Sequence, residues 1–273
     1  MELWAWGMLR NLVLEVILLF DVIVLDLDGT LLKSDKTVSE KTIEALKKCE
    51  NLGKKIVIAT ARPPRFGKLA LPEDLRNEMK IFYNGAEIYC GENRIYSKNI
   101  PVESLRKILN ILRNKRVSLE INDILYSNFD VTGIFGNIRY ERTDFEYFEL
   151  KPAAKVLVDL TCMDNIEDIS CDLPTDCDMV VTDNGTLCQI MARDVSKLNA
   201  LKIILNQLGT TLDRVAFFGD DFNDIDLIKE CGVGIAMGNA VPKLKEIANY
   251  VTKSNDEDGI AFFLNSYING SIA

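Results

Sequence analysis

Short apolar runs alternate with helical patterns near both ends of the chain. Continuous apolar runs of strand length lie at 22–27, 55–59 and 214–218. Apolar positions at helical spacing occupy 39–52, 196–208 and 223–231, and the first two of these segments end at a glycine. Continuous apolar strands that alternate with helices indicate a parallel sheet covered on both faces. The predicted fold class is therefore α/β.

The middle of the chain has a different pattern. Between about 84 and 190, candidate strands alternate polar and apolar residues, aromatic residues are frequent, and helices are expected near 101–114 and 152–163. This stretch holds 11 basic and 18 acidic residues, so it carries −7 of the formal net charge of −9. We therefore predict a parallel-sheet core formed by residues 21–83 and 191–273, with an inserted α+β domain at 84–190.

Residues 1–20 form an apolar extension outside this pattern. Arg10, Glu15 and Asp21 interrupt the run, so no uncharged stretch approaches the ~18 residues of a membrane span. A signal peptide is also disfavoured, because Glu2 leads the segment and no small-residue cleavage site precedes the first strand. We expect the extension to pack on the body of the protein or on another subunit, with a membrane-surface role as the less favoured alternative.

Composition excludes several kinds of chemistry. The chain has 273 residues and no histidine, which rules out a Ser-His-Asp triad and a histidine-ligated zinc site. The acidic net charge lacks the basic surface that nucleic-acid binding requires. Seven cysteines without a CxxC pair indicate reduced thiols and hence a cytoplasmic protein. Acid–base chemistry must therefore fall to Asp, Glu, Lys, Tyr or Cys.

Two acidic clusters follow predicted strands. Asp26-Leu27-Asp28-Gly29 lies at the end of the first strand, and Asp220 and Asp221 come just after the strand at 214–218. Residues i and i+2 of an extended backbone point the same way, so Asp26 and Asp28 are expected to present both carboxylates to one site. Ligands of parallel sheets bind at the carboxyl ends of the strands, where these clusters converge. A hard cation such as Mg²⁺ would relieve the repulsion between them.

Candidate ligands for an anionic substrate lie at the same edge. Thr60, Ala61 and Arg62 follow the second strand and offer a hydroxyl, backbone N–H groups and a guanidinium. Lys197 lies at the start of the helix at 196–208, beside a helix N-terminus, which is a favourable position for phosphate. Arg65 and the basic run at 113–116 are expected on the surface.

The arrangement resembles the haloacid dehalogenase superfamily, in particular the Cof-type hydrolases with a large inserted cap (type IIB). The matching segments are DLDGTL at 26–31, ATARP at 59–63, YNGA at 83–86, Lys197 with Ala200 and Leu201, GDDFND at 219–224 and AMGNA at 236–240. The resemblance runs from about 22 to 265 and includes the order and spacing of the motifs. It implies a Rossmann-like core, with the insert at 84–190 as a cap that determines substrate specificity. Gly232–Gly238 looks like a dinucleotide fingerprint but has one residue too many, and is expected to form a turn.

What the resemblance implies is a Mg²⁺-dependent phosphatase that acts on a small organic phosphate, such as a sugar phosphate or a phosphorylated cofactor. Asp26 would attack phosphorus to form an aspartyl phosphate, and Asp28 would act as the general acid and base. The phosphate and substrate ligands would be Thr60, Ala61, Arg62, Asn84, Lys197 and Asn223. Mg²⁺ would be held by the Asp26 carboxylate, the Asp28 main-chain carbonyl and Asp220, while Asp224 would join the metal shell or orient Lys197.

Some alternatives stay open at this point. Ala61 and Leu198 stand where the family usually has glycine, which can reshape the phosphate pocket. A phosphomutase on the same scaffold is the nearest rival function, and a non-catalytic phosphate-ligand sensor is the non-enzymatic one. The expected partner is a small-molecule phosphate rather than nucleic acid or a membrane, and the protein is expected to be a monomer or a homodimer.

Overall fold

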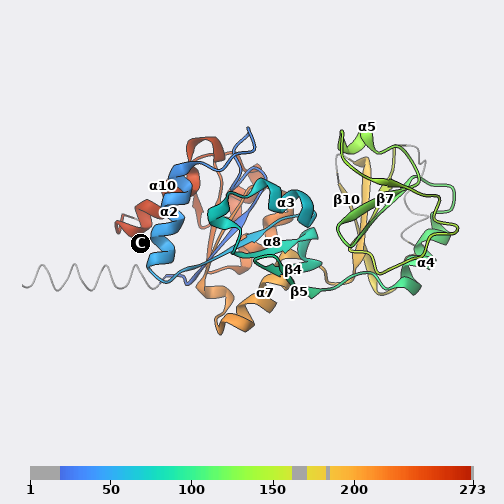
Figure 1. Cartoon of the computed structure of the whole chain (residues 1–273). Helices are drawn as coiled ribbons and strands as arrows, with labels where there is room; N and C mark the ends of the chain where they lie inside the picture. The colour runs from blue at the N-terminus through green and yellow to red at the C-terminus, as the bar shows by residue number, and fades with distance from the viewer. Residues whose placement is uncertain (1–18, 162–170, 183–184, 272–273) are drawn as a thin grey trace, which may run out of the picture.

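The structure is a computed structural model that describes residues 19–161, 171–182 and 185–271. Its described residues form two β-sheets, each with its own hydrophobic core (Figure 1). The interpretation of the amino-terminal extension falls almost entirely outside these residues. Phe20 is described and fully buried, and its ring stacks on Tyr267 with 4.4 Å between the ring centroids. Within the described ranges, no helix has both the length and the hydropathy of a membrane-spanning segment.

The larger sheet has eight strands in the order β14-β13-β12-β1-β2-β3-β4-β5. Its strands are β1 (Val22–Asp26), β2 (Lys55–Ala59), β3 (Met79–Phe82), β4 (Glu87–Cys90), β5 (Asn93–Ser97), β12 (Val215–Gly219), β13 (Val233–Ala236) and β14 (Tyr250–Val251). The six strands from β14 to β3 are parallel, whereas β4 and β5 extend the sheet in antiparallel fashion. All five residues of β1 and of β12 are buried, as expected for central strands covered on both faces.

Helices connect these strands. They are α2 (Glu40–Asn51), α3 (Pro64–Ala70), α7 (Lys197–Leu208), α8 (Ile225–Glu230), α9 (Pro242–Ile247) and α10 (Gly259–Ile268). Ser39 and Ser196 cap α2 and α7 by accepting a backbone N–H three residues later, at 3.1 Å in each case. Helix α2 packs against α10, and α7 packs against α8. We call this sheet with its helices the core, and it confirms the predicted α/β fold class.

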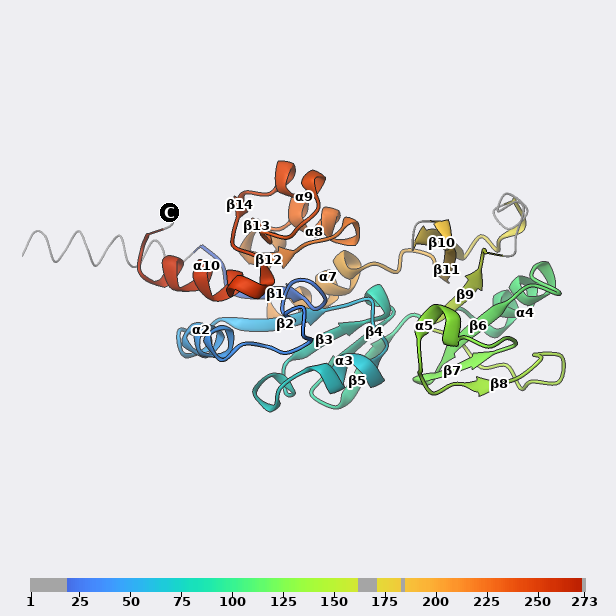
Figure 2. The ribbon, with the colours of Figure 1, turned by 90° about the horizontal axis from the view of Figure 1, so that it is seen from above.

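The smaller sheet has six strands in the order β10-β11-β9-β6-β7-β8. Its elements are α4 (Val102–Ile111), β6 (Val117–Ile121), β7 (Ile124–Ser127), α5 (Thr132–Phe135), β8 (Glu141–Arg142), β9 (Lys155–Asp159), β10 (Cys177–Thr182) and β11 (Leu187–Ala192). We call this unit the cap. Figure 2 shows it beside the core, joined by the chain after β5 and the chain before α7.

Three local predictions differ from the structure. The helix expected at 152–163 is wrong, because Lys155–Asp159 forms β9 between β6 and β11. Val156 and Val158 are β-branched and pack into the cap core, and an apolar run this short does not distinguish a strand from a helix by periodicity. The glycine-rich segment expected as a turn instead contains β13. A Cβ on Gly234 would lie 2.3 Å from the Ile228 carbonyl oxygen, so glycine permits this close approach.

The third difference concerns the start of the insert. Residues 84–97 fall within the predicted insert, yet β4 and β5 pair with β3 of the larger sheet. The cap sheet itself begins only with β6, after α4. Alternation of polar and apolar residues predicts an antiparallel strand but does not indicate which sheet it joins.

Candidate active site

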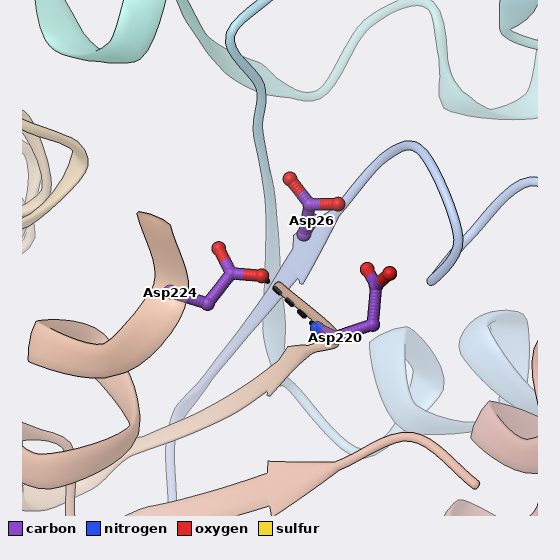
Figure 3. Close-up of side chains that lie close together, drawn as sticks. All are labelled: Asp26, Asp220 and Asp224. Atoms are coloured by element: carbon purple, nitrogen blue, oxygen red, sulfur yellow. Dashed lines mark hydrogen bonds between the residues drawn. The ribbon is translucent and has the colours of Figure 1, made fainter. Parts of the chain in front are cut away.

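Three carboxylates meet at the carboxyl ends of adjacent strands. Asp26 is the last residue of β1, and Asp220 directly follows β12, the parallel neighbour of β1. Asp224 ends the short helix η5 (Phe222–Asp224). One oxygen from each of the three carboxylates lies within 4.8 Å of the others (Figure 3). The sheet edge predicted from the sequence is therefore the place where acidic side chains gather.

Lys197 is the ammonium that faces this cluster. Its Nζ donates to Asp26 Oδ1 at 2.5 Å and to Asp224 Oδ1 at 2.8 Å, and only 3% of Lys197 is exposed. Burial acts to lower the pKa of Lys197, but Asp224 and Asp26 outweigh it and raise that pKa, so the side chain stays charged. Burial raises the pKa of Asp26 well above its usual value, despite the neighbouring ammonium. The Lys197 ammonium therefore does not fully compensate the burial of the Asp26 carboxylate.

Asp224 connects Lys197 to the loop that carries Asp220 and Asp221. Its Oδ1 accepts from Lys197, and its Oδ2 accepts the backbone N–H groups of Asp220 at 3.0 Å and Asp221 at 3.2 Å. It is fully buried. Of the two roles considered for Asp224, these contacts match the positioning of Lys197 and of the loop that carries Asp220.

Asp220 is the more accessible carboxylate of the cluster. Its Oδ1 accepts from the Thr30 hydroxyl at 2.7 Å. Burial raises the pKa of Asp220 to about 6, with Asp224 and Asp221 adding to the rise and Thr30 opposing it. Gly29 lies close to the Asp220 carboxylate and has φ +75°. A Cβ on Gly29 would lie 2.2 Å from Asp220 Oδ2. The glycine of the first motif is thus required by both backbone conformation and space.

Asp28 does not present its carboxylate to this cluster. Arg62 donates to it through Nε at 2.6 Å and Nη2 at 2.5 Å, and Lys36 Nζ donates to its Oδ1 at 3.0 Å. Burial acts to raise the pKa of Asp28, but these hydrogen bonds outweigh it and lower that pKa. The sequence placed the Asp26 and Asp28 carboxylates in one site, whereas in the structure Asp28 pairs with Arg62 and Lys36, after β1 has ended at Asp26 and the chain has turned. Lys36 was not predicted, and no motif marks it.

The remaining predicted residues hydrogen-bond to one another or line a small cavity that also contains Lys197. Thr60 follows β2, is buried, and accepts the Arg62 N–H through Oγ1 at 3.1 Å. Asn84 has φ 54° and donates its N–H to the Thr60 carbonyl oxygen at 3.0 Å. A cavity of about 240 Å³ is lined by Asn84, Lys197 and Asn223 from the core, and by Met179 and other cap residues.

A second, larger cavity of about 820 Å³ lies between core and cap. The core lines it with Ala61, Arg62 and Arg65, and the cap with residues of β6, β9 and β11 that include Glu120 and Gln189. Arg65 was expected on the surface, but it forms a paired contact with Glu120 at 2.7 and 2.8 Å and leaves only 19% of its side chain exposed. The tertiary arrangement of core and cap creates this ion pair, so no local sequence signal indicates it.

Comparisons with known proteins agree with this geometry. The family described as haloacid dehalogenase-like hydrolase matches residues 23–264. The chain is 31% identical over 249 residues to the putative phosphatase YkrA of Bacillus subtilis, covering 88% of this chain and 95% of that protein. It is 27% identical over 264 residues to the 5-amino-6-(5-phospho-D-ribitylamino)uracil phosphatase YitU of the same organism, covering 90% and 97%.

Solved structures give the same picture. TM0651 from Thermotoga maritima superposes with a TM-score of 0.79 at 26% identity, covering 90% of this chain and 97% of that one. The subclass IIB sugar phosphatase BT4131 superposes with a TM-score of 0.74 at 25% identity, covering 90% and 98%. The similarity therefore extends over both the core and the cap.

Proposed function

The chain belongs to the haloacid dehalogenase-like hydrolases and is a phosphatase of the Cof type, and we propose that it hydrolyses a small phosphomonoester through an aspartyl phosphate (an acyl phosphate) formed on Asp26, with Mg²⁺ as cofactor. The observation that carries this proposal is the position of Asp26. It is buried at the end of a central strand, paired with Lys197 and close to two further carboxylates. A nucleophile, a phosphate-binding cation and metal ligands are thereby available in one place.

The donor set fits Mg²⁺. Asp26 and Asp220 offer carboxylate oxygens, which are hard ligands, and the raised pKa values of both groups reflect burial and mutual repulsion that a divalent cation would relieve. We propose that these two carboxylates and the main-chain carbonyl of Asp28 hold the ion, while Asp224 positions Lys197. When bound, Mg²⁺ would neutralise negative charge on the phosphate oxygens and favour the ionised form of the nucleophile.

The chemistry assigned to the chain's own residues proceeds in two steps. A carboxylate oxygen of Asp26 attacks phosphorus, the bond from phosphorus to the ester oxygen breaks, and Asp28 gives a proton to the leaving alcohol. Asp28 then takes a proton from water, whose oxygen attacks phosphorus and releases inorganic phosphate and Asp26. Lys197 and the Thr60 hydroxyl would hold the phosphate oxygens throughout. Removal of one such ligand usually costs about 10²- to 10³-fold in rate.

The hydrogen bonds between Arg62 and the Asp28 carboxylate must break before Asp28 can be protonated and act as an acid. Arg62 and Lys36 now favour its ionised form. A phosphomonoester dianion that enters beside Thr60 would compete for the Arg62 guanidinium, because Arg binds phosphate as readily as carboxylate. We propose that substrate binding thereby frees the Asp28 carboxyl group to take up its proton.

The substrate is proposed to be small, because residues of the cap line the cavities that contain Lys197 and Arg62. YitU is named for 5-amino-6-(5-phospho-D-ribitylamino)uracil, and BT4131 is named as a sugar phosphatase. Both kinds of phosphomonoester are therefore candidates for this chain, and phosphorylated cofactors form a third group. A cavity of about 820 Å³ is large enough for any of them.

Phosphate release from a panel of these compounds tests the proposal. We expect hydrolysis in Mg²⁺ that stops on chelation and returns when Mg²⁺ is added back. Asp26→Asn should lower kcat at least about 10³-fold, whereas Asp226→Asn, an exposed change on the neighbouring helix α8, should leave kcat unchanged. Activity that survives chelation would contradict the metal assignment, and full activity of Asp26→Asn would contradict the nucleophile. An isomerised sugar phosphate without free phosphate would instead indicate a phosphomutase.

A further inference from the structure

One of the sequence segments that match the family, AMGNA at 236–240, has no role in the site described so far. The segment leaves β13 and leads into α9. Within it, the Met237 N–H donates to the Gly219 carbonyl oxygen at 3.0 Å. Directly after it, the Val241 N–H donates to the Asp220 carbonyl oxygen at 2.9 Å. The turn after β13 is therefore attached to the loop that carries the proposed metal ligand Asp220.

Asn239 attaches the same turn to the loop after β1. Its Nδ2 donates to the Gly29 carbonyl oxygen at 2.8 Å, between residues 210 positions apart in the chain. The close contact with Asp220 requires glycine at position 29, but a residue without a Cβ has an unusually free backbone. A hydrogen bond to the Gly29 carbonyl oxygen restricts the ψ angle of this residue, because the peptide group is planar. Asn239 thus restrains the backbone directly after Asp28.

Asn255 supports Asn239 and holds the loop after β1 at a second point. Its backbone N–H donates to Asn239 Oδ1 at 3.0 Å, and its Nδ2 donates to the Leu32 carbonyl oxygen at 2.9 Å. Gly238 permits this approach of the two segments, since a Cβ there would lie 2.5 Å from the Ser254 backbone nitrogen. The Asn239 amide therefore has an N–H donor at its oxygen and a carbonyl acceptor at its nitrogen, and these two partners determine its orientation.

We infer that Asn239 is a positioning residue for the Mg²⁺ site and acts through the Gly29 carbonyl group. This inference rests on the proposed function, in which the Asp28 main-chain carbonyl and the Asp220 carboxylate hold the ion. The turn after β13 bonds to both loops that carry these ligands. It therefore holds the two loops in a fixed relation before the ion binds. Residues that orient metal ligands in this way usually contribute about 10- to 100-fold to metal affinity.

Asn239→Ala tests this inference, because it removes both side-chain hydrogen bonds and changes no proposed metal ligand. Calorimetric titration of the full chain with Mg²⁺ should give a Kd about tenfold higher than that of the wild-type protein. Asn239 is exposed, so the urea midpoint of unfolding, measured with a chelator, should change little. Asn206→Ala is the matched control, since Asn206 is an exposed residue of α7. Its Kd for Mg²⁺ should stay within about twofold of the wild-type value.

The Mg²⁺ dependence of phosphate release gives a second readout. Asn239→Ala should need about tenfold more Mg²⁺ for half of its maximal rate, while kcat at saturating Mg²⁺ stays within about threefold of the wild-type value. We expect this split because the bound ion itself holds its ligands in place. Asn255→Ala removes only the side-chain bond to Leu32 and leaves the backbone N–H on Asn239. It should raise the Kd for Mg²⁺ by about threefold.

The outcomes distinguish the inference from the function on which it rests. If Asn239→Ala lowers the urea midpoint but leaves the Kd for Mg²⁺ unchanged, the residue is merely structural and the inference is overturned. A loss of kcat that saturating Mg²⁺ does not restore would overturn it as well. In both cases the phosphatase proposal stands, because it concerns the wild-type protein. A wild-type protein that binds no Mg²⁺ would overturn both the metal assignment and the inference. If it binds Mg²⁺ but releases no phosphate from any compound of the panel, the proposed function fails, and the calorimetric comparison still decides the role of Asn239.

Discussion

Asp224→Asn distinguishes a positioning carboxylate from a metal ligand. The native carboxylate uses Oδ1 for Lys197 and Oδ2 for the backbone N–H groups of Asp220 and Asp221. Asparagine has nearly the same shape but only one acceptor oxygen. Whichever way the amide is oriented, its NH₂ group faces either an ammonium or two N–H donors.

The magnitude follows from these contacts. A hydrogen bond in which one partner is charged contributes about 1.5–3 kcal/mol, and a buried donor left unpaired adds a desolvation cost. Since one side of the amide always loses its partners, we expect the free energy of unfolding to fall by about 2–5 kcal/mol. Lys197 and the loop carrying Asp220 would both shift, so kcat/KM should fall about 10²-fold or more.

Urea unfolding in the presence of a chelator measures the first effect, and phosphate release in Mg²⁺ measures the second. Asp226→Asn is the matched control, because Asp226 is exposed on α8. This substitution should change the free energy of unfolding by no more than about 0.5 kcal/mol. If Asp224→Asn leaves metal-free stability unchanged and removes only the stabilisation by Mg²⁺, Asp224 is a metal ligand and the positioning argument is refuted.

Three other perturbations probe the site and the contact between core and cap. Gly29→Ala should lower kcat/KM at least about tenfold, because the added Cβ would collide with Asp220. Gly53→Ala is the control: Gly53 also has a positive φ, +82°, but no atom lies within 4 Å of the added Cβ. In the same assays, Gly53→Ala should lower the free energy of unfolding by about 1 kcal/mol and leave kcat/KM unchanged. Because the pKa of Asp220 is raised to about 6, protons bind the folded state more tightly, so stability from this group in metal-free protein should fall as pH rises from about 4 to 6. The apparent Mg²⁺ affinity, measured by calorimetry, should weaken about tenfold per pH unit below 6, and a pH-independent affinity would rule out Asp220 as a ligand. Arg65→Met leaves Glu120 buried without its ion-pair partner and should lower the free energy of unfolding, measured in urea, by about 2–4 kcal/mol. The double variant Arg65→Met with Glu120→Met should regain much of this loss. Additive losses from the two substitutions would contradict the pairing.

Much of the core could be read from the sequence because its signals are local. Continuous apolar strands, helices ended by glycine, and acidic residues just after strands all depend on near neighbours in the chain. Parallel strands align their carboxyl ends, so Asp26, Thr60 and Asp220 could be placed at one edge before any coordinates were known. The position of Lys197 at a helix N-terminus added it to this edge, and the family resemblance extended the placement to Asn84.

Side-chain partners could not be read in the same way. The orientation of Asp28 depends on the turn after β1 and on Arg62 and Lys36, and the two roles considered for Asp224 differ only in which atoms its oxygens meet. The strand at 155–159 was missed because its stabilisation comes from two neighbouring strands of the cap and not from its own sequence.

The sequence by itself determined the fold class, the strands and helices of the core that carry the site, and the residue types at the site, because periodicity and motif spacing are properties of a single segment. The tertiary structure alone decided how the core and cap meet. Arg65 and Glu120 are 55 residues apart in the chain and form an ion pair only when α3 lies against β6. Arg62 of the core and Gln189 of the cap line a common cavity for the same reason, since burial and hydrogen bonds depend on distances in space that no single segment encodes.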